Sequence, residues 1–149
     1  MRILVTGGCG FIGSDFVNYV YKNHKEYQLV VVDKLTYAAD EFSIPSDIPL
    51  IKKDICNVTI EDTGNFDYLV NFAAESHVDN SIKDGSPFVK TNVLGTFNLL
   101  ELAKKTVDLK KFVQISTDEV YGDLDLVRKY HSNEYDRLIP SSYYSATKA

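Results

Sequence analysis

Two groups of residues near the end of the chain have the types and spacing that acid–base chemistry requires. Tyr144 and Lys148 stand four positions apart, which places both side chains on one face of a helix. A phenol titrates near pH of about 10, and a nearby ammonium would lower its pKa toward the range of a useful base. Tyr143 directly precedes Tyr144, and only the spacing to the lysine favours Tyr144. The same spacing also arises by chance in ordinary helices.

The second group is Thr117, Asp118 and Glu119, which follow directly after an apolar run. Loops at the carboxyl ends of parallel strands bind ligands in open α/β sheets. Two adjacent carboxyl groups can serve as acid and base when their surroundings separate their pKa values. From spacing alone, a solvated turn is an equally good interpretation of these residues.

A glycine pattern near the amino terminus predicts a phosphate-binding loop. Gly7, Gly10 and Gly13 lie between an apolar run and a helical segment. The first allows a tight turn, the second lets the backbone approach a pyrophosphate, and the third packs the helix against the sheet. Asp33 comes 20 residues after Gly13 at the end of the next apolar run, where a carboxylate binds ribose hydroxyls and repels a 2′-phosphate. Although a flexible turn is the alternative, the combination predicts dinucleotide binding, with NAD favoured over NADP despite the adjacent Lys34.

The elements that must position these groups are apolar, β-branched runs separated by helical segments. We expect strands over residues 3–6, 29–32, 69–72 and 112–115, and a shorter one over 50–51. Continuous apolar runs are typical of a parallel sheet that is buried on both faces. Strands that alternate with helices predict an α/β fold, a doubly wound (Rossmann) parallel sheet with helices on both faces.

Apolar periodicity predicts two helices. The first ends near residue 24 and buries a face that carries Ile12, Phe16, Tyr19 and Val20. The second begins with Ser86 as its N-cap and Pro87 in its first turn. Its expected buried stripe consists of Val89, Val93, Thr96, Leu100 and Ala103. Residues 123–137 are polar and aperiodic, which predicts a long loop.

Length and composition exclude several classes of protein. The 149 residues suit one domain, and the net charge of −5 argues against a nucleic-acid partner. No apolar run approaches the roughly 20 residues of a membrane span. Cys9 and Cys56 lack metal-ligand spacing, so we expect no metal, free thiols and a cytoplasmic protein. Cys9 fits the glycine loop as a small filler, without a histidine partner that would make it a nucleophile.

Several motifs together resemble the dTDP-glucose 4,6-dehydratases of the extended short-chain dehydrogenase/reductase family. They are TGGCGFIG, VVDKLTYA, KKDI, NFAAESHVD, KTNVLGTFNLLE, ISTDEVYGD and PSSYYSATKA. The resemblance runs from residue 1 to 149 and is weak over 41–67 and 124–137. The Asp118–Glu119 pair marks the dehydratase branch, because related epimerases and decarboxylases usually lack it. Asn80 and Tyr143 stand where the family usually carries arginine and proline.

The resemblance implies dehydration of a nucleotide-activated glucose, dTDP-glucose to dTDP-4-keto-6-deoxyglucose, around one bound NAD⁺ that takes hydride from C4 and returns it to C6. Tyr144, assisted by Lys148 and Thr117, would remove the proton of the sugar 4-hydroxyl. Glu119 would take the C5 proton while Asp118 protonates the departing 6-hydroxyl. Ser76 and Thr117 would contact the sugar.

The resemblance also implies which residues hold the cofactor, at the glycine loop and after the strand ends. They are Gly7, Gly10, Phe11, Ile12, Gly13, Asp33, Lys34, Leu35, Thr36, Asp54, Ile55, Ala73, Ala74, Glu75, Ser76, Thr91, Tyr144 and Lys148.

Family members are about twice as long as this sequence. The resemblance therefore implies that residues 1–149 form the NAD-binding domain, truncated before the last sheet strand and the nucleotide-sugar domain. We expect such a chain to bind NAD more readily than it turns over substrate. The alternatives are another nucleotide-sugar epimerase or decarboxylase, and a non-catalytic NAD-binding or dimerisation module. In the family, the helix near residues 87–106 and the tyrosine helix build a dimer interface, which implies a homodimer.

Overall fold

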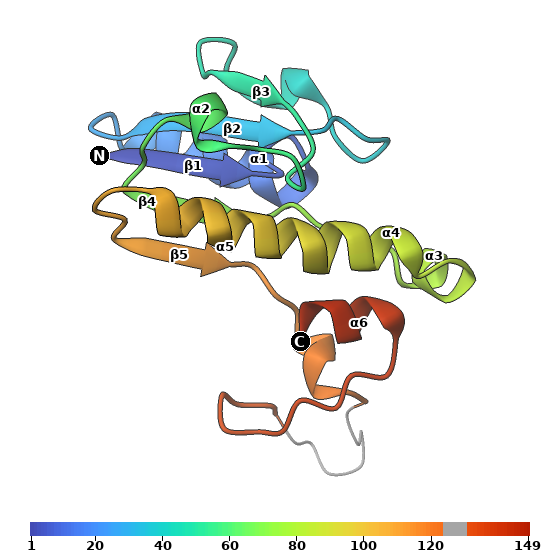
Figure 1. Ribbon diagram of the computed structural model, residues 1–149. Coiled ribbons are helices and arrows are strands. Elements are labelled where there is room, and N and C mark those ends of the chain that lie inside the picture. The colour runs from blue at the N-terminus through green and yellow to red at the C-terminus, as the bar shows by residue number, and fades with distance from the viewer. Residues whose placement is uncertain (124–130) are drawn as a thin grey trace.

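The computed structural model describes residues 1–123 and 131–149 (Figure 1). Five strands form one parallel sheet in the order β3-β2-β1-β4-β5. The strands are β1 (Arg2–Thr6), β2 (Gln28–Asp33), β3 (Leu50–Lys52), β4 (Tyr68–Asn71) and β5 (Lys111–Gln114). The sequence-based prediction of a doubly wound parallel sheet is confirmed, and every expected strand is present.

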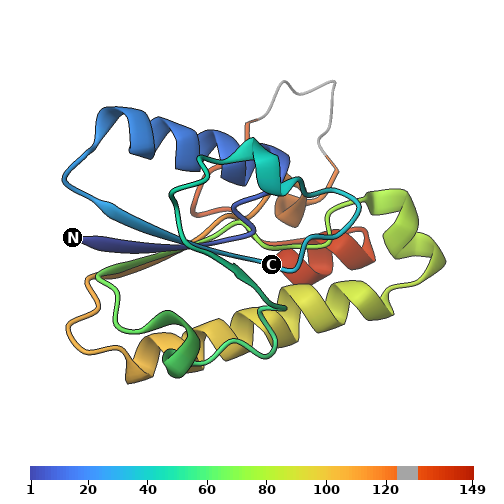
Figure 2. The ribbon, with the colours of Figure 1, turned by 90° about the horizontal axis from the view of Figure 1, so that it is seen from above.

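Helices cover both faces of this sheet, which Figure 2 shows nearly edge-on. On one side lies α1 (Phe11–Asn23), and on the other lie α2 (Ile60–Thr63) and α5 (Thr96–Lys105). The shorter helices α3 (Val78–Lys83), α4 (Ser86–Phe88) and α6 (Tyr143–Lys148) lie beyond the carboxyl ends of the strands (Figure 1). A π-helical segment, η2 (Val89–Gly95), joins α4 to α5, and η1 (Glu41–Ser43) and η3 (Asp118–Tyr121) are 3₁₀ turns.

Two apolar cores hold the layers together, one on each face of the sheet. Side chains alternate along β1, so that Val5 faces Val17 and Val20 of α1, whereas Leu4 packs on the side of α5 with Leu99. Burial of β1 on both faces explains why its sequence is a continuous apolar run rather than an alternating one.

The buried face of α1 differs from the predicted one. Val20 is buried and Phe16 packs partly buried against the core, as expected, but the other large buried side chain is Val17, whereas Ile12 and Tyr19 are 63% and 59% exposed. Gly13 lies directly against the glycine loop, and this contact sets the rotation of the helix about its axis.

The buried face of the long helix also differs from the predicted one. Ala103 is buried as expected, whereas Val89, Val93 and Leu100 are exposed. Gly85 rather than Ser86 is the N-cap, and the amide of Ser86 donates to Asp84 Oδ1 at 2.9 Å. Apolar residues lie on two faces of this helix, so periodicity could not choose between them. The close approach of Gly95 to Ile55 selects the buried face. A solvent-facing apolar strip remains, which consists of Val89, Val93, Leu94, Phe97 and Leu100.

The predicted long loop falls partly outside the described residues. Residues 131–142 contain turns and no helix or strand, in agreement with the expectation, whereas residues 124–130 are not described. In the part of the chain that is described, no helix is long and apolar enough to cross a membrane.

Candidate functional site

The glycine loop between β1 and α1 is shaped by two close approaches. Gly7 has a φ of 70°, and a Cβ atom there would lie 2.5 Å from the backbone nitrogen of Ala73. A Cβ atom at Gly13 would lie 2.2 Å from the carbonyl oxygen of Gly7. No side chain fits at either position, so the turn and the packing of α1 against the sheet both need glycine.

The amino terminus of α1 has the properties of an anion site. Gly10 is the N-cap, it offers no side-chain hydrogen bond to the helix, and the first turn carries no acidic residue. The first amide groups and the positive end of the helix dipole are therefore not neutralised by the helix itself. Among the described residues, a Cβ at Gly10 would meet only the Gly7 carbonyl oxygen, at 3.5 Å. This open backbone fits a diphosphate.

Asp33 connects the glycine loop to the end of β2. Its Oδ2 accepts a hydrogen bond from the backbone amide of Cys9 at 3.0 Å, and its Oδ1 accepts one from Leu35 at 2.8 Å. The side chain is 7% exposed and lies beside the groove described below. A carboxylate has about four lone-pair sites, so Asp33 can still accept hydrogen bonds from a ribose.

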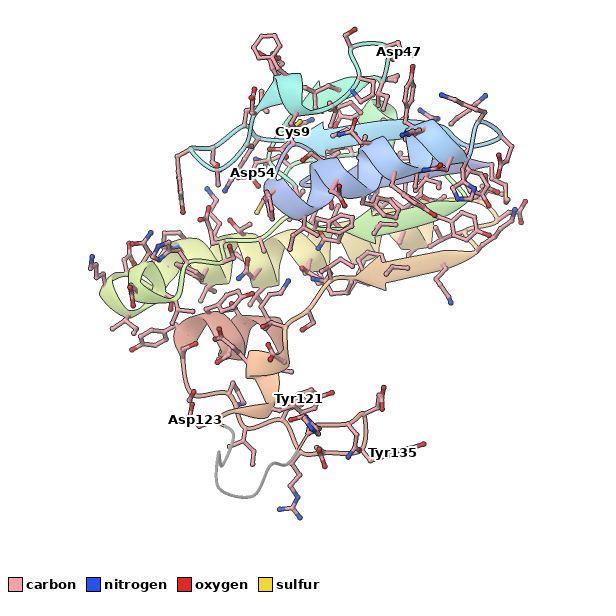
Figure 3. The ribbon with its side chains drawn as sticks, turned by 180° about the vertical axis from the view of Figure 1, so that it is seen from behind. Cys9, Asp47, Asp54, Tyr121, Asp123 and Tyr135 are labelled. Atoms are coloured by element: carbon pink, nitrogen blue, oxygen red, sulfur yellow. The ribbon has the colours of Figure 1, made fainter. Side chains whose placement is uncertain are left out.

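Cys9 is 2% exposed within the core beneath this loop (Figure 3). Burial, followed by the charge of Asp33, raises the pKa of its thiol to about 11. A buried thiol with a raised pKa has little thiolate at neutral pH, which is consistent with the interpretation of Cys9 as a filler.

A groove with two adjoining hollows follows the carboxyl ends of β2, β1, β4 and β5. Gly7, Gly10, Ala38, Phe72 and Ala74 line both hollows and make the groove continuous. The first hollow, the Asp33 end, is also lined by Val32, Asp33, Lys34, Thr36, Ala39, Lys53, Ile55, Ala73 and Thr91. The second, the Tyr144 end, adds Phe11, Ile12, Gly13, Ser76, Ile115, Ser116, Tyr144 and Lys148.

The groove brings together most of the cofactor residues predicted from the sequence. Leu35, Asp54 and Glu75 do not line it. Leu35 packs against the core with a φ of 54°, and Asp54 accepts a hydrogen bond from the Cys56 amide at 2.9 Å. The lining residues that the sequence reasoning missed are Val32, Ala38, Ala39, Lys53, Phe72, Ile115 and Ser116. Most of them follow or end a strand, which is the signal that could have found them.

Tyr144 and Lys148 both reach the groove from α6. Ser142 is the N-cap of this helix, and its hydroxyl accepts a hydrogen bond from the amide of Ser145 in a capping box. The ammonium of Lys148 donates to the carbonyl oxygen of Ile115 at 2.5 Å, and burial lowers the pKa of this lysine. The hydroxyl of Ser116 donates to the carbonyl of Lys148 at 2.9 Å and ties α6 to the end of β5.

The pKa of Tyr144 is shifted in the direction opposite to the expected one. Burial raises it, a hydrogen bond with Thr117 lowers it, and the carboxylates of Glu119 and Asp118 raise it further. Lys148, whose ammonium donates to the Ile115 carbonyl, is not among the groups that shift this pKa. Tyr144 is therefore a neutral phenol at physiological pH.

Asp118 and Glu119 lie on η3. Figure 1 shows this turn next to α6 and beyond β5. Both side chains are exposed, and they line a separate hollow together with Tyr121, Gly122, Asp123, His131 and Ser132. Thr117 caps η3 by accepting a hydrogen bond from the Glu119 amide at 3.3 Å. The predicted acid–base residues thus fall into two neighbouring groups, with Thr117 between the carboxylates and Tyr144.

Asn92 is a buried positioning residue that the sequence reasoning missed. Its Oδ1 accepts from the amide of Glu75 at 2.8 Å, and its Nδ2 donates to the carbonyl of Glu75 and to Thr147 Oγ1, each at 2.9 Å. The side chain is 5% exposed and lies in the π-helical segment η2. Asn92 therefore fastens the loop after β4 to α6, and with it both sides of the Tyr144 end.

The sequence profile of the family described as GDP-mannose 4,6 dehydratase matches residues 4–149. A dTDP-glucose 4,6-dehydratase from Mycobacterium tuberculosis is 44% identical over 154 residues, which cover 100% of this chain and 46% of that protein. A dTDP-glucose 4,6-dehydratase from Haemophilus influenzae is 43% identical over 167 residues, covering 100% of this chain and 48% of that protein.

Solved structures agree with the sequence comparisons. The crystal structure of DesIV, a dTDP-glucose 4,6-dehydratase from Streptomyces venezuelae with NAD and TYD bound, has a TM-score of 0.90 and 38% identity over 99% of this chain and 48% of that one. A UDP-galactose 4-epimerase has a TM-score of 0.86 and 33% identity, over 99% of this chain and 48% of that one. The chain spans about half the length of these bacterial relatives and structures. It belongs to the NAD-dependent epimerase/dehydratase family and resembles the amino-terminal part of the dTDP-glucose 4,6-dehydratases.

Proposed function

We propose that residues 1–149 act as the NAD-binding domain of a nucleotide-sugar 4,6-dehydratase. The observation that carries this proposal is the continuous groove from Asp33, past the open amino terminus of α1, to Tyr144 and Lys148. In this assignment the ribose hydroxyls bind Asp33 and the diphosphate lies on the amides that follow Gly10. The family's structures with NAD bound support the choice of cofactor.

Bound NAD⁺ would supply a hydride acceptor for C4, the hydride donor for C6 once it is reduced, and a positively charged ring at the Tyr144 end. The chain's own residues would move the protons. Tyr144, hydrogen-bonded to Thr117, takes the proton of the sugar 4-hydroxyl once a positive charge beside it lowers its pKa. Glu119 takes the C5 proton, and Asp118 protonates the departing 6-hydroxyl. Ser76 and Thr117 contact the sugar.

The substrate that we propose is dTDP-glucose, converted to dTDP-4-keto-6-deoxyglucose. Relatives named for this substrate and the Asp118–Glu119 pair on η3 support a dehydratase. A nucleotide-sugar 4-epimerase is the second candidate, favoured by the structural match to UDP-galactose 4-epimerase. Recognition of the nucleotide is assigned to no described residue, and in this proposal it belongs to a separate nucleotide-sugar domain.

Calorimetric titration of the chain with NAD tests the proposed cofactor. We expect saturable binding of one NAD per chain, and no detectable binding would contradict the proposal. Incubation with NAD and dTDP-glucose, followed by the absorbance of 4-keto sugars in alkali, tests the chemistry. We expect little turnover by residues 1–149 alone. Rapid formation of the 4-keto product would contradict the assignment of this chain as the cofactor-binding part, and formation of a 4-epimer would favour the second candidate.

We also propose that the chain forms a homodimer and is cytoplasmic. The solvent-facing apolar strip on η2 and α5 supports self-association, since large apolar patches usually mark interfaces. Both cysteines are unpaired thiols, which suits a reducing compartment.

A further inference from the structure

Two lysines line the Asp33 end of the groove, and each is bound by a carboxylate. The ammonium of Lys34 lies 3.1 Å from Glu75 Oε1 and 3.3 Å from Thr91 Oγ1. The ammonium of Lys53 lies 2.6 Å from Asp62 Oδ2. Among the described residues that line this end, these are the two cations, so neither is free to bind a further anion.

The Lys34 contact matters because of where Lys34 stands in the chain. It follows Asp33 directly, and in dinucleotide-binding folds a basic residue near this position binds the 2′-phosphate that distinguishes NADP from NAD. In this chain the ammonium instead reaches across β1, from the end of β2 to the loop after β4. The Lys34 and Glu75 side chains are 31% and 18% exposed, so solvent screens this pair less than a fully exposed one.

The side chain of Asn92 fixes the backbone at Glu75, the residue that pairs with Lys34. Both the backbone amide and the carbonyl of Glu75 are hydrogen-bonded to the side chain of Asn92. Glu75 does not line the groove itself. The side chain of Glu75 reaches the Asp33 end through its contact with Lys34.

We infer that Glu75 is a positioning residue that sets cofactor selectivity. Because Glu75 pairs with Lys34, no free ammonium at the Asp33 end attracts a 2′-phosphate. The carboxylate of Asp33 repels this phosphate, so the groove binds NAD in preference to NADP. The inference rests on the proposed function, because it assumes that the groove binds an adenine dinucleotide. It adds that NADP is excluded by two acidic groups, one acting directly and one through a lysine.

The variant Glu75→Gln tests this inference. Glutamine keeps the length of the side chain and the backbone contacts to Asn92, but its neutral amide no longer offsets the positive charge of Lys34. Calorimetric affinities for NAD and NADP give their ratio, and we expect the ratio to shift toward NADP by about tenfold, as one partly screened ammonium–phosphate interaction predicts. In the double variant Glu75→Gln/Lys34→Gln the shift should disappear, which a merely structural effect of Glu75 would not produce.

Glu101→Gln on α5 is the matched control. Glu101 forms an exposed ion pair with Lys104 and lies away from the groove, so this variant changes the net charge equally. We expect it to leave the NADP-to-NAD ratio as it is in the parent chain. A shift of the same size in Glu101→Gln would overturn the inference, since net charge alone would then explain selectivity.

The outcomes separate the inference from the proposed function. If the parent chain binds neither dinucleotide, the proposed function fails. If it binds NAD but Glu75→Gln leaves the ratio unchanged, the role of Glu75 is wrong and the proposed function stands. If Glu75→Gln does not fold, Lys34→Gln tests the inference by itself. A restrained lysine contributes nothing to NADP binding, so Lys34→Gln should leave the NADP-to-NAD ratio as it is in the parent chain. A shift of the ratio against NADP in Lys34→Gln would overturn the inference.

Discussion

Asp33 shows how one side chain serves the fold and the proposed ligand together. Its distance from the glycine pattern was sufficient to predict a carboxylate at the edge of the sheet. Its hydrogen bonds to the amides of Cys9 and Leu35 could not be predicted, because they depend on the conformation of two loops. The same limit applies to Asn92 and Tyr144, whose partners come from distant segments of the chain.

The Asp33→Asn variant should lose both stability and NAD affinity. An amide replaces a charged acceptor, so one of the two backbone N–H groups faces a donor, and we expect a loss of about 1–3 kcal/mol in the free energy of unfolding. NAD affinity should fall by about tenfold, as the loss of one charge-assisted hydrogen bond predicts. Urea unfolding and calorimetry measure the two effects.

Asp40→Asn is the control for Asp33→Asn. Asp40 also accepts a backbone hydrogen bond, from Phe42 at 3.0 Å, but at an exposed 3₁₀ turn outside the groove. It should cost less stability and leave NAD affinity as in the parent. Unchanged NAD affinity in Asp33→Asn would remove this residue from the proposed site.

At the scale of elements, the position of each strand and of the two long helices was predictable, but the rotation of the helices was not. Continuous apolar runs locate buried strands, since both faces are covered. The helix over α4, η2 and α5 carries apolar residues on two faces, and Gly95 decides which one packs on the sheet. The short elements α2, α3 and η3 lack a periodic pattern and went unpredicted.

Asn92→Ala should loosen the attachment of α6 to the sheet. It removes three hydrogen bonds and leaves the Glu75 backbone without partners, which should cost about 2–4 kcal/mol in the free energy of unfolding. Hydrogen exchange of the α6 amides should accelerate more than that of α1. Asn23→Ala, which removes one exposed bond within α1, is the control. Equal effects of the two variants would contradict the role of Asn92.

A charge placed in the apolar strip should dissociate the proposed dimer. Phe97 is 61% exposed at the centre of the strip, so Phe97→Glu should give a monomer in size-exclusion chromatography with light scattering. Ile82→Glu, at a 65% exposed site on α3 outside the strip, should leave the dimer intact. A parent chain that is monomeric at all concentrations would rule the dimer out.

At the scale of the whole molecule, acidic residues connect the strands and make stability depend on pH. Asp67 accepts a hydrogen bond from the Arg2 amide at 2.7 Å and pairs with Lys110 at 2.9 Å, which joins β1 to the segments before β4 and β5. The Arg2 bond, followed by the Lys110 contact, holds the pKa of Asp67 below its ordinary value. In the same way, Lys53 lowers the pKa of Asp62.

These lowered pKa values predict acid sensitivity. In the unfolded chain the carboxyls of Asp62 and Asp67 have pKa values of about 3.9, so their contribution to the stability of the fold is complete above that pH. It is lost as the pH falls through the lower pKa values of the folded chain. The midpoint of thermal unfolding should therefore drop between about pH 4 and pH 2. Asp67→Asn should flatten this dependence, and an equally steep curve in that variant would contradict the account.

The fold, the glycine loop and the position of Asp33 were thus predictable from glycine spacing and strand ends, whereas most other predicted groove residues followed from the family resemblance. The distribution of the acid–base residues over two hollows was not, because it depends on how η3 and α6, which are distant in the sequence, lie relative to the groove. Sequence spacing describes neighbours along one element, whereas the Tyr144 end is built from five separate segments of the chain.

The central claim is that a dinucleotide lies with its diphosphate on the open backbone at Gly10. Calorimetric titration of Gly10→Val with NAD tests it most directly. The backbone of Gly10, with φ −77° and ψ 173°, suits any residue, and an added Cβ finds no clash within the described protein, so the fold should persist. We predict an unchanged circular dichroism spectrum together with the loss of NAD binding. NAD binding as tight as that of the parent chain would contradict the claim.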